Sequence, residues 1–313
     1  MVVPIAQLIK IQDYITRYEW DTFRYPTQYI RLKNENWNKL YEQWRDPVEP
    51  KEEIEEAIPD STVFSKIKDR FKKQKVTSEL LHEDEIDEKQ PLPSTELELK
   101  QDFLDNLLNF QMKWATSTVT HSSIVDQKYY KDSLLKYLLQ GFPDTFLLMY
   151  DPIFTIRKAP IEGNIIIITP IGIEIVHFVE YGEEAKIIAS EERTWLVETF
   201  NNQRKILNPT ISLKRTEKLI KSILAVENLE FAIKKTVLSR NNHINFATAP
   251  YNTQIIGKLN YDEWFQEKRR LVSPLKNLQI KTAEALLKHC QTTSVRRPEW
   301  EEDGPLTLMD MEE

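Results

Sequence analysis

Several side chains that could take part in chemistry lie close together in the sequence, at Asp151, Glu162, Glu174, His177 and Glu180. Two carboxylates that converge on one point can hold a Mg²⁺ ion and support phosphodiester hydrolysis. Because side chains of a strand alternate between its faces, we expect His177 on one face and Glu174 and Glu180 on the other. Asp151 and Glu162 remain as an alternative acidic pair.

The other reactive residue types give weaker signals. None of the five histidines has metal-ligand spacing to another, and we interpret His177 as a hydrogen-bonded core or edge residue. Cys290 is the single cysteine, so it cannot form a disulfide within the chain, and we expect it to be a half-buried small residue. Only six glycines are present, and no Gly-rich phosphate loop is found. We therefore predict no cofactor and no bound metal.

The pattern around these residues predicts a sheet. Asn164–Thr169 contains four consecutive isoleucines, Thr169-Pro-Ile-Gly172 fits a tight turn, and an apolar strand follows to Glu180. Asn208-Pro209 predicts the start of a helix. We expect further strands over 145–150, 153–157, 185–189, 195–200, 231–238 and 244–247, and further helices over 126–140, 261–270 and 275–290. This alternation predicts an α/β domain with helices packed on a mixed sheet.

The patterns outside this sheet region predict how the chain is divided into domains. Apolar residues at helical spacing predict helices over 4–45, interrupted at Pro26, with an aromatic stripe. Thr95 and Glu98 form a capping box that opens another helix. We predict a helical hairpin over 1–45, an acidic and largely flexible linker with a short basic helix over 46–93, the α/β domain with its leading helices over 94–290, and an acidic disordered tail over 291–313.

The order of elements over about 126–250 resembles the nuclease-related domain (NERD) family. The residues that carry the resemblance are Thr169-Pro-x-Gly172, Trp195 and Asn208-Pro209. The resemblance implies a restriction-endonuclease-like fold, in which a mixed sheet is flanked by helices. It also implies a metal-dependent nuclease site on the strands around the turn.

This chain departs from the family pattern at that site. The family's aspartate and histidine before the turn fall at Asn164 and Ile165, and its Glu-x-Lys falls at His177 and Val179. An asparagine carbonyl is neutral, Mg²⁺ disfavours a histidine nitrogen, and valine cannot stabilise a charge.

Two further positions follow from the same resemblance. The family's glutamine after Asn-Pro falls at Ser212, and its helix glutamate falls near Asp132. The resemblance thus implies a catalytically degenerate member.

The charge distribution adds a possible binding face. Residues 126–290 carry a net charge of +4, between flanks of −6 and −5. Basic side chains gather on the helix after Asn208, at Lys214, Arg215, Lys218 and Lys221, and a second basic cluster spans 268–270. We interpret both as ordinary solvated helix faces, with phosphate contacts of a nucleic acid as the alternative for the first. The longest apolar run is too short and too interrupted to cross a bilayer, so we expect a cytoplasmic protein without membrane contact.

Our leading hypothesis is a non-catalytic binding or regulatory protein with an unknown protein partner, nucleic acid being possible. One alternative is a metal-dependent nuclease with relocated acidic residues. Another is a helical protein–protein adaptor.

Overall fold

A computed structural model describes residues 4–46 and 93–297. The described residues belong to two compact units, one formed by 4–35 and 102–297 and the other by 36–46 and 93–101. The linker and basic helix predicted between 46 and 93 fall almost entirely outside the described residues. The disordered tail predicted over 291–313 is wrong for 291–297, because β14 (Val295–Arg296) pairs there with β2 (His121–Ser122). The rest of the predicted tail lies outside the described residues. Within the described part, none of the helices combines the length and apolar content that a bilayer crossing requires.

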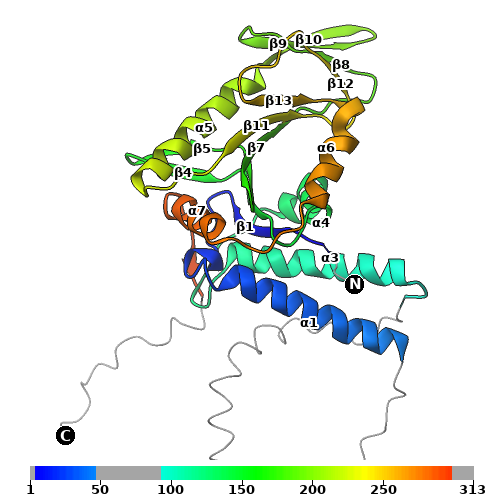
Figure 1. The fold of residues 1–313 in the computed structure, drawn as a ribbon, viewed down its shortest axis with the longest axis vertical. Coiled ribbons are helices and arrows are strands. Elements are labelled where there is room, and N and C mark those ends of the chain that lie inside the picture. Colours follow the sequence, from blue (N-terminus) through cyan, green and yellow to red (C-terminus); the bar gives the residue numbers. More distant parts are fainter. Residues whose placement is uncertain (1–3, 47–92, 298–313) are drawn as a thin grey trace, which may run out of the picture. The chain divides into compact units, whose positions relative to one another are not determined.

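A six-stranded mixed sheet is the centre of the larger unit (Figure 1). Its spatial order is β1 (Gln7–Ile11), β3 (Leu147–Tyr150), β6 (Ile165–Thr169), β7 (Gly172–Phe178), β11 (Ile233–Leu238) and β13 (Thr253–Ile256). β1 is parallel to β3, β6 is antiparallel to both of its neighbours, and β7, β11 and β13 are parallel. The mixed sheet confirms the predicted α/β class.

Helices cover both faces of this sheet, as the continuous apolar strands require. Figure 1 shows α5 (Pro209–Val226) and α7 (Asn277–Lys288) on one face, with α4 (Ser133–Gly141) and α6 (Lys258–Arg270) on the other. Gln279 of α7 donates to the carbonyls of Thr145 and Ile168 at 2.6 and 3.0 Å, which joins this helix to the sheet. Asn208 caps α5 through the Thr210 amide at 3.0 Å, as predicted.

The tight turn between β6 and β7 is present. The Thr169 hydroxyl accepts from the Ile171 amide at 3.3 Å and donates to the Gly172 carbonyl at 2.8 Å. A Cβ on Gly172 would lie 2.8 Å from the Ala232 carbonyl oxygen, so the close approach of β11 requires glycine here.

A smaller sheet lies beyond the carboxyl ends of β7 and β11. It has the order β10 (Asn202–Leu207), β9 (Thr194–Thr199), β8 (Lys186–Ile188) and β12 (His243–Asn245). Trp195 is buried there, and its indole N–H donates to the Ser190 carbonyl at 2.9 Å. Short pairs complete the larger unit: β4 (Ile153–Ile156) with β5 (Ala159–Glu162), and β2 (His121–Ser122) with β14 (Val295–Arg296), together with the short helices η1 (Arg17–Glu19) and η2 (Gln127–Lys131).

The two long helices, α1 (Tyr25–Arg45) and α3 (Glu96–Thr116), each have residues in both units. Within the smaller unit, the rings of Trp37, Tyr41 and Trp44 follow one another at 5.7 and 5.8 Å between centroids. The predicted capping box is confirmed, because Thr95 accepts from the Glu98 amide and Glu98 accepts from the Thr95 amide, both at 3.2 Å.

The helix predicted over the first residues is wrong. Residues 7–11 form β1, an edge strand whose five residues are all buried. Gln7 and Lys10, which look like the polar side of a helix, are satisfied by distant groups: Gln7 donates to the Asp144 carbonyl, and Lys10 forms an ion pair with Glu19. The helical hairpin predicted over 1–45 is therefore wrong in its first half, and Pro26 lies in the first turn of α1 instead of interrupting a helix.

Candidate functional site

The candidate site lies at one edge of the central sheet, where β3 and β7 end and β6 begins. The antiparallel register of β6 with β7 places Ile165 opposite Val176, so Asn164 and His177 are neighbours across the two strands. In sheets of this kind, ligands bind at the carboxyl ends of the parallel strands. A ligand-binding site of this fold is therefore expected at this end of the strands.

Four polar side chains form a hydrogen-bonded network there, which we call the Asn164 network: Asn164, His177, Ser212 and Thr216. The Asn164 amide nitrogen donates to Nδ1 of His177 at 2.9 Å and to the Ser212 hydroxyl at 3.3 Å. The Asn164 carbonyl oxygen accepts from the Thr216 hydroxyl at 2.9 Å. Two strands and the inner face of α5 thus meet through one amide.

The network fixes the state of His177. An amide nitrogen only donates, so Nδ1 must accept and the ring hydrogen must lie on Nε2. Burial lowers the pKa of His177, which keeps the imidazole neutral at physiological pH. A neutral histidine that already accepts from Asn164 is a structural hydrogen-bonding group, as the sequence interpretation expected.

Ser212 is not arranged as a nucleophile. Its hydroxyl donates to the Pro209 carbonyl at 2.9 Å, whereas the Nδ1 atom of His177 lies 3.3 Å away and already accepts the Asn164 amide. An activated serine needs its proton directed at a base that is free to take it. The arrangement instead holds the first turn of α5 against the sheet.

Val179 does not join the network. It follows the last residue of β7, its side chain is buried, and its amide donates to the Leu238 carbonyl at 2.8 Å. At the position that the NERD resemblance assigns to a lysine, the chain therefore provides apolar packing.

Glu174 and Glu180, the two acids predicted on the opposite face from His177, form ion pairs away from the Asn164 network. Glu174 is buried and accepts from Thr236 at 2.7 Å, Trp264 at 3.0 Å and Lys268 at 2.5 Å. Glu180 accepts from both Nε and Nη2 of Arg240, at 2.6 and 2.7 Å. The predicted face of Glu174 is confirmed, and each carboxylate already has a cation.

Asp151 forms no ion pair among the described residues. It follows β3 with a φ of 45°, and burial, aided by the nearby Asp132 and Glu162, raises its pKa to about 6. Asp132 itself caps α4 and accepts from the Tyr150 hydroxyl at 2.7 Å. Across residues 4–46 and 93–297, no group of three or more His, Cys, Asp or Glu residues is placed to hold a metal ion.

The basic residues of α5 lie beside the Asn164 network, and all four are exposed. Arg215 donates to the Glu162 carbonyl at 3.1 Å, and Lys221 pairs with Glu217 at 2.9 Å. Lys214 and Lys218 have no partner among the described residues. Those two lysines are therefore the cations of α5 that remain available to an external anion.

The second basic cluster matches the expected solvated face at Arg269 and Arg270, which are exposed, but not at Lys268. Lys268 lies largely buried beside Glu174, and the Arg269 guanidinium lies 5.6 Å from the centre of the Phe265 ring. Lys268 is buried because it neutralises an acid inside the fold, a pairing that the local sequence does not reveal.

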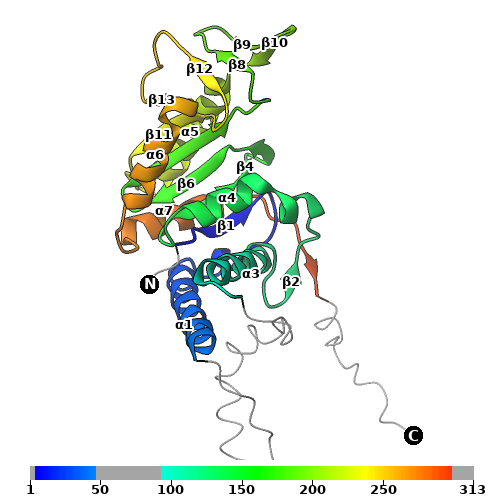
Figure 2. The same cartoon turned by 90° about the vertical axis from the view of Figure 1, so that its right-hand side faces the viewer.

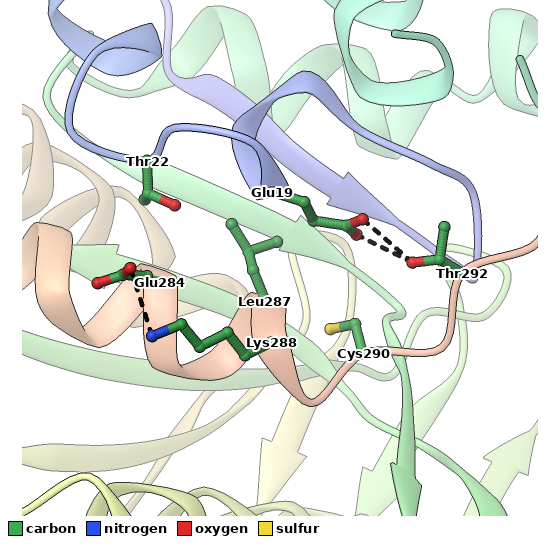
Figure 3. Close-up of a pocket in the computed structure, with 7 residues that line it drawn as sticks. All are labelled: Glu19, Thr22, Glu284, Leu287, Lys288, Cys290 and Thr292. Carbon is green, nitrogen blue, oxygen red and sulfur yellow. Dashed lines mark hydrogen bonds and ion pairs between the residues drawn. The ribbon is translucent and has the colours of Figure 1, made fainter. Parts of the chain in front are cut away.

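Cys290 lines a small pocket of about 190 Å³ between η1, α7 and the following residues (Figure 3). Burial raises the pKa of its thiol to about 12, so the reactive thiolate is suppressed. Glu19, on the wall of this pocket, accepts from Thr292 and Lys10. The interpretation of Cys290 as a structural residue is consistent with this placement.

Sequence reasoning missed one member of the network, Thr216. Its hydroxyl also accepts from the Asn164 backbone amide at 3.3 Å, so it anchors both the backbone and the side chain of that residue. Thr216 lies four residues after Ser212, on the same face of α5, and that spacing was the available signal.

Comparisons with known proteins reach only part of the chain. A curated protein from Geobacillus stearothermophilus, named RNA 2′,3′-cyclic phosphodiesterase, is 32% identical over 120 residues, which cover 34% of this chain. The match spans 36% of that relative, about a third of its length. No family model matches the chain. No solved structure matches it.

Proposed function

We propose that this chain is a non-catalytic binding protein built on a degenerate nuclease-related domain. The supporting observation is the Asn164 network, in which an amide, an imidazole and two hydroxyls satisfy one another at the sheet edge. A Mg²⁺ ion needs anionic oxygens, and this set offers only neutral donors and acceptors. A site whose members are bonded to each other is suited to holding a scaffold together.

The ligand that we propose is single-stranded RNA, bound through its phosphates. Lys214 and Lys218 are exposed on α5 without partners among the described residues, next to the Asn164 network. Lysines placed in this way contact phosphates as point charges and give affinity without sequence specificity. The name of the partial relative, an RNA 2′,3′-cyclic phosphodiesterase, favours RNA over DNA as the first ligand to test.

Fluorescence anisotropy with a labelled single-stranded RNA tests this proposal. The double variant Lys214→Gln/Lys218→Gln should weaken binding and reduce the slope of log K against log salt by roughly 0.7 for each lost contact. The matched control Lys234→Gln/Lys281→Gln removes two exposed lysines outside α5. Binding that is absent at low salt, or that the two double variants weaken equally, would overturn the RNA proposal.

One observation favours a second candidate, a metal-dependent nuclease with relocated acids. Asp132 and Glu162 lie near enough to Asp151 to help raise its pKa, so three acids lie in one region. On this reading a divalent ion would bind Asp151 and Glu162 and lower the pKa of Asp151. Metal-dependent cleavage that Glu162→Gln abolishes would favour this candidate over the first.

The helical adaptor also remains a prediction. Capture of a partner from lysate by the full chain, and loss of that capture when the exposed side chains of Trp20 and Phe23 are replaced by alanine, tests it.

A further inference from the structure

Arg17, in the short helix η1, is a buried charge with unsatisfied donors. Only 3% of its surface is exposed, and its guanidinium carbon lies 5.6 Å from the centre of the Trp114 ring. Its Nε and Nη2 atoms are covered and donate to no acceptor in the described part of the chain. Buried charged donors are normally paired, because an unpaired buried charge is strongly unfavourable.

A second arginine approaches from the other end of the chain. Arg297 follows β14, which pairs with β2 (Figure 2), and its backbone amide donates to the Thr120 carbonyl at 2.9 Å. Its Nε atom is also covered and has no acceptor among the described residues. The Ser123 hydroxyl accepts from the Ile15 amide at 2.9 Å and donates to the Thr293 carbonyl at 2.6 Å, so the segments that carry Arg17 and Arg297 lie side by side.

The electrostatics at Arg17 favour binding of an anion. Burial lowers the pKa of Arg17, Arg297 lowers it further, and the neighbouring Tyr25 acts in the opposite direction. Within residues 4–46 and 93–297, no carboxylate forms an ion pair with either arginine. An anion between the two guanidinium groups would satisfy the unpaired donors and reduce their repulsion.

We propose that Arg17 and Arg297 form a binding site for a phosphate group. Guanidinium groups bind phosphate oxygens in pairs, and an aromatic ring behind one of them fixes its plane. Trp114 supplies that ring for Arg17, and Tyr25 lies edge-on to the same ring at 5.3 Å between centroids. Arg297 is only half-buried, which gives the anion its approach.

This site is separate from the Asn164 network and from α5. None of its residues takes part in the proposed RNA contact, so either proposal can fail while the other stands.

Isothermal titration of the full chain with sodium phosphate, against sodium chloride at equal ionic strength, tests the site. We expect saturable binding by the native chain and by Arg296→Gln, which removes an exposed neighbouring charge. Arg297→Gln should bind about 10- to 100-fold more weakly, because it loses charge-assisted hydrogen bonds. Absence of saturable binding, or equal binding by Arg297→Gln and the native chain, would overturn the proposal.

Two further measurements show whether the bound phosphate belongs to a nucleotide or is free phosphate, and whether the variant is folded. Adenosine 5′-monophosphate that binds more tightly than inorganic phosphate would support the site as one for a nucleotide phosphate, whereas equal affinities would support free phosphate. Far-UV circular dichroism must show Arg297→Gln to be folded. Should that variant not fold, saturable phosphate protection of native-chain Arg297 against phenylglyoxal modification supports the site, and unchanged modification contradicts it.

Discussion

Replacing Asp151 by asparagine should stabilise the protein at neutral and higher pH. The carboxylate is partly buried near two other acids, which raises its pKa from 3.8 to about 6. Such a group contributes stability that is fully present below the unfolded pKa of 3.8 and is lost as the pH rises through the folded pKa. Above that range, the folded state carries the whole cost of the buried charge.

The magnitude follows from the size of this shift. A difference of about two units, at 1.36 kcal/mol for each, corresponds to about 3 kcal/mol as an upper value. The substituted side chain would carry no charge, and asparagine tolerates the φ of 45° at this position. We therefore expect Asp151→Asn to raise the free energy of unfolding by up to about 3 kcal/mol near pH 8 and to change it little near pH 3.

Urea denaturation across this pH range measures the effect. The control is Glu162→Gln, an exposed neighbouring acid, for which a change within about 0.5 kcal/mol is expected. The reasoning is refuted if Asp151→Asn is no more stable than the native chain near pH 8, or if its advantage does not depend on pH.

Three other substitutions probe the sheet and its polar contacts. Asn164→Ala should destabilise the fold by about 2–4 kcal/mol in urea denaturation, because the Thr216 hydroxyl and Nδ1 of His177 lose their partner, whereas the exposed Asn201→Ala should change little. Glu174→Gln should cost about 3–5 kcal/mol by leaving Lys268 without its anion, and a cost as small as that of the exposed Glu267→Gln would contradict this. Because burial lowers the pKa of His177, its neutral form contributes stability that is present above the unfolded pKa of 6.5 and is lost as the pH falls through the folded pKa. His177→Gln should remove this acid-induced loss, and an unchanged acid profile would argue against it.

The parts of the fold that could be predicted depend on local signals. The isoleucine run, the turn at Thr169 and the Asn208 cap are each encoded within a few residues, and all three are present. β1 was missed because its apolar residues fit helical spacing equally well and its partner β3 lies about 140 residues later. β10 and β13 were missed as well, since an exposed edge strand such as β10 carries little apolar pattern.

The site was predicted in position but not in its bonding. Counting from the motifs of the NERD resemblance identified Asn164, His177 and Ser212, which the fold does bring together. The same counting included Val179, whose side chain packs in the core instead. The groups that surround Glu174, Asp151 and Arg17 come from other segments of the chain, so the burial of these charges could not be inferred from neighbouring residues.

A cleavage time course tests the central claim most directly. Labelled single-stranded RNA and DNA would be incubated with the pure full chain in Mg²⁺ and in Mn²⁺, with a metal-free reaction as control. Because no carboxylate joins the Asn164 network, the account predicts no metal-dependent loss of either substrate. Cleavage that requires the metal, that Asp151→Asn or Glu162→Gln abolishes and that Glu267→Gln retains would contradict it.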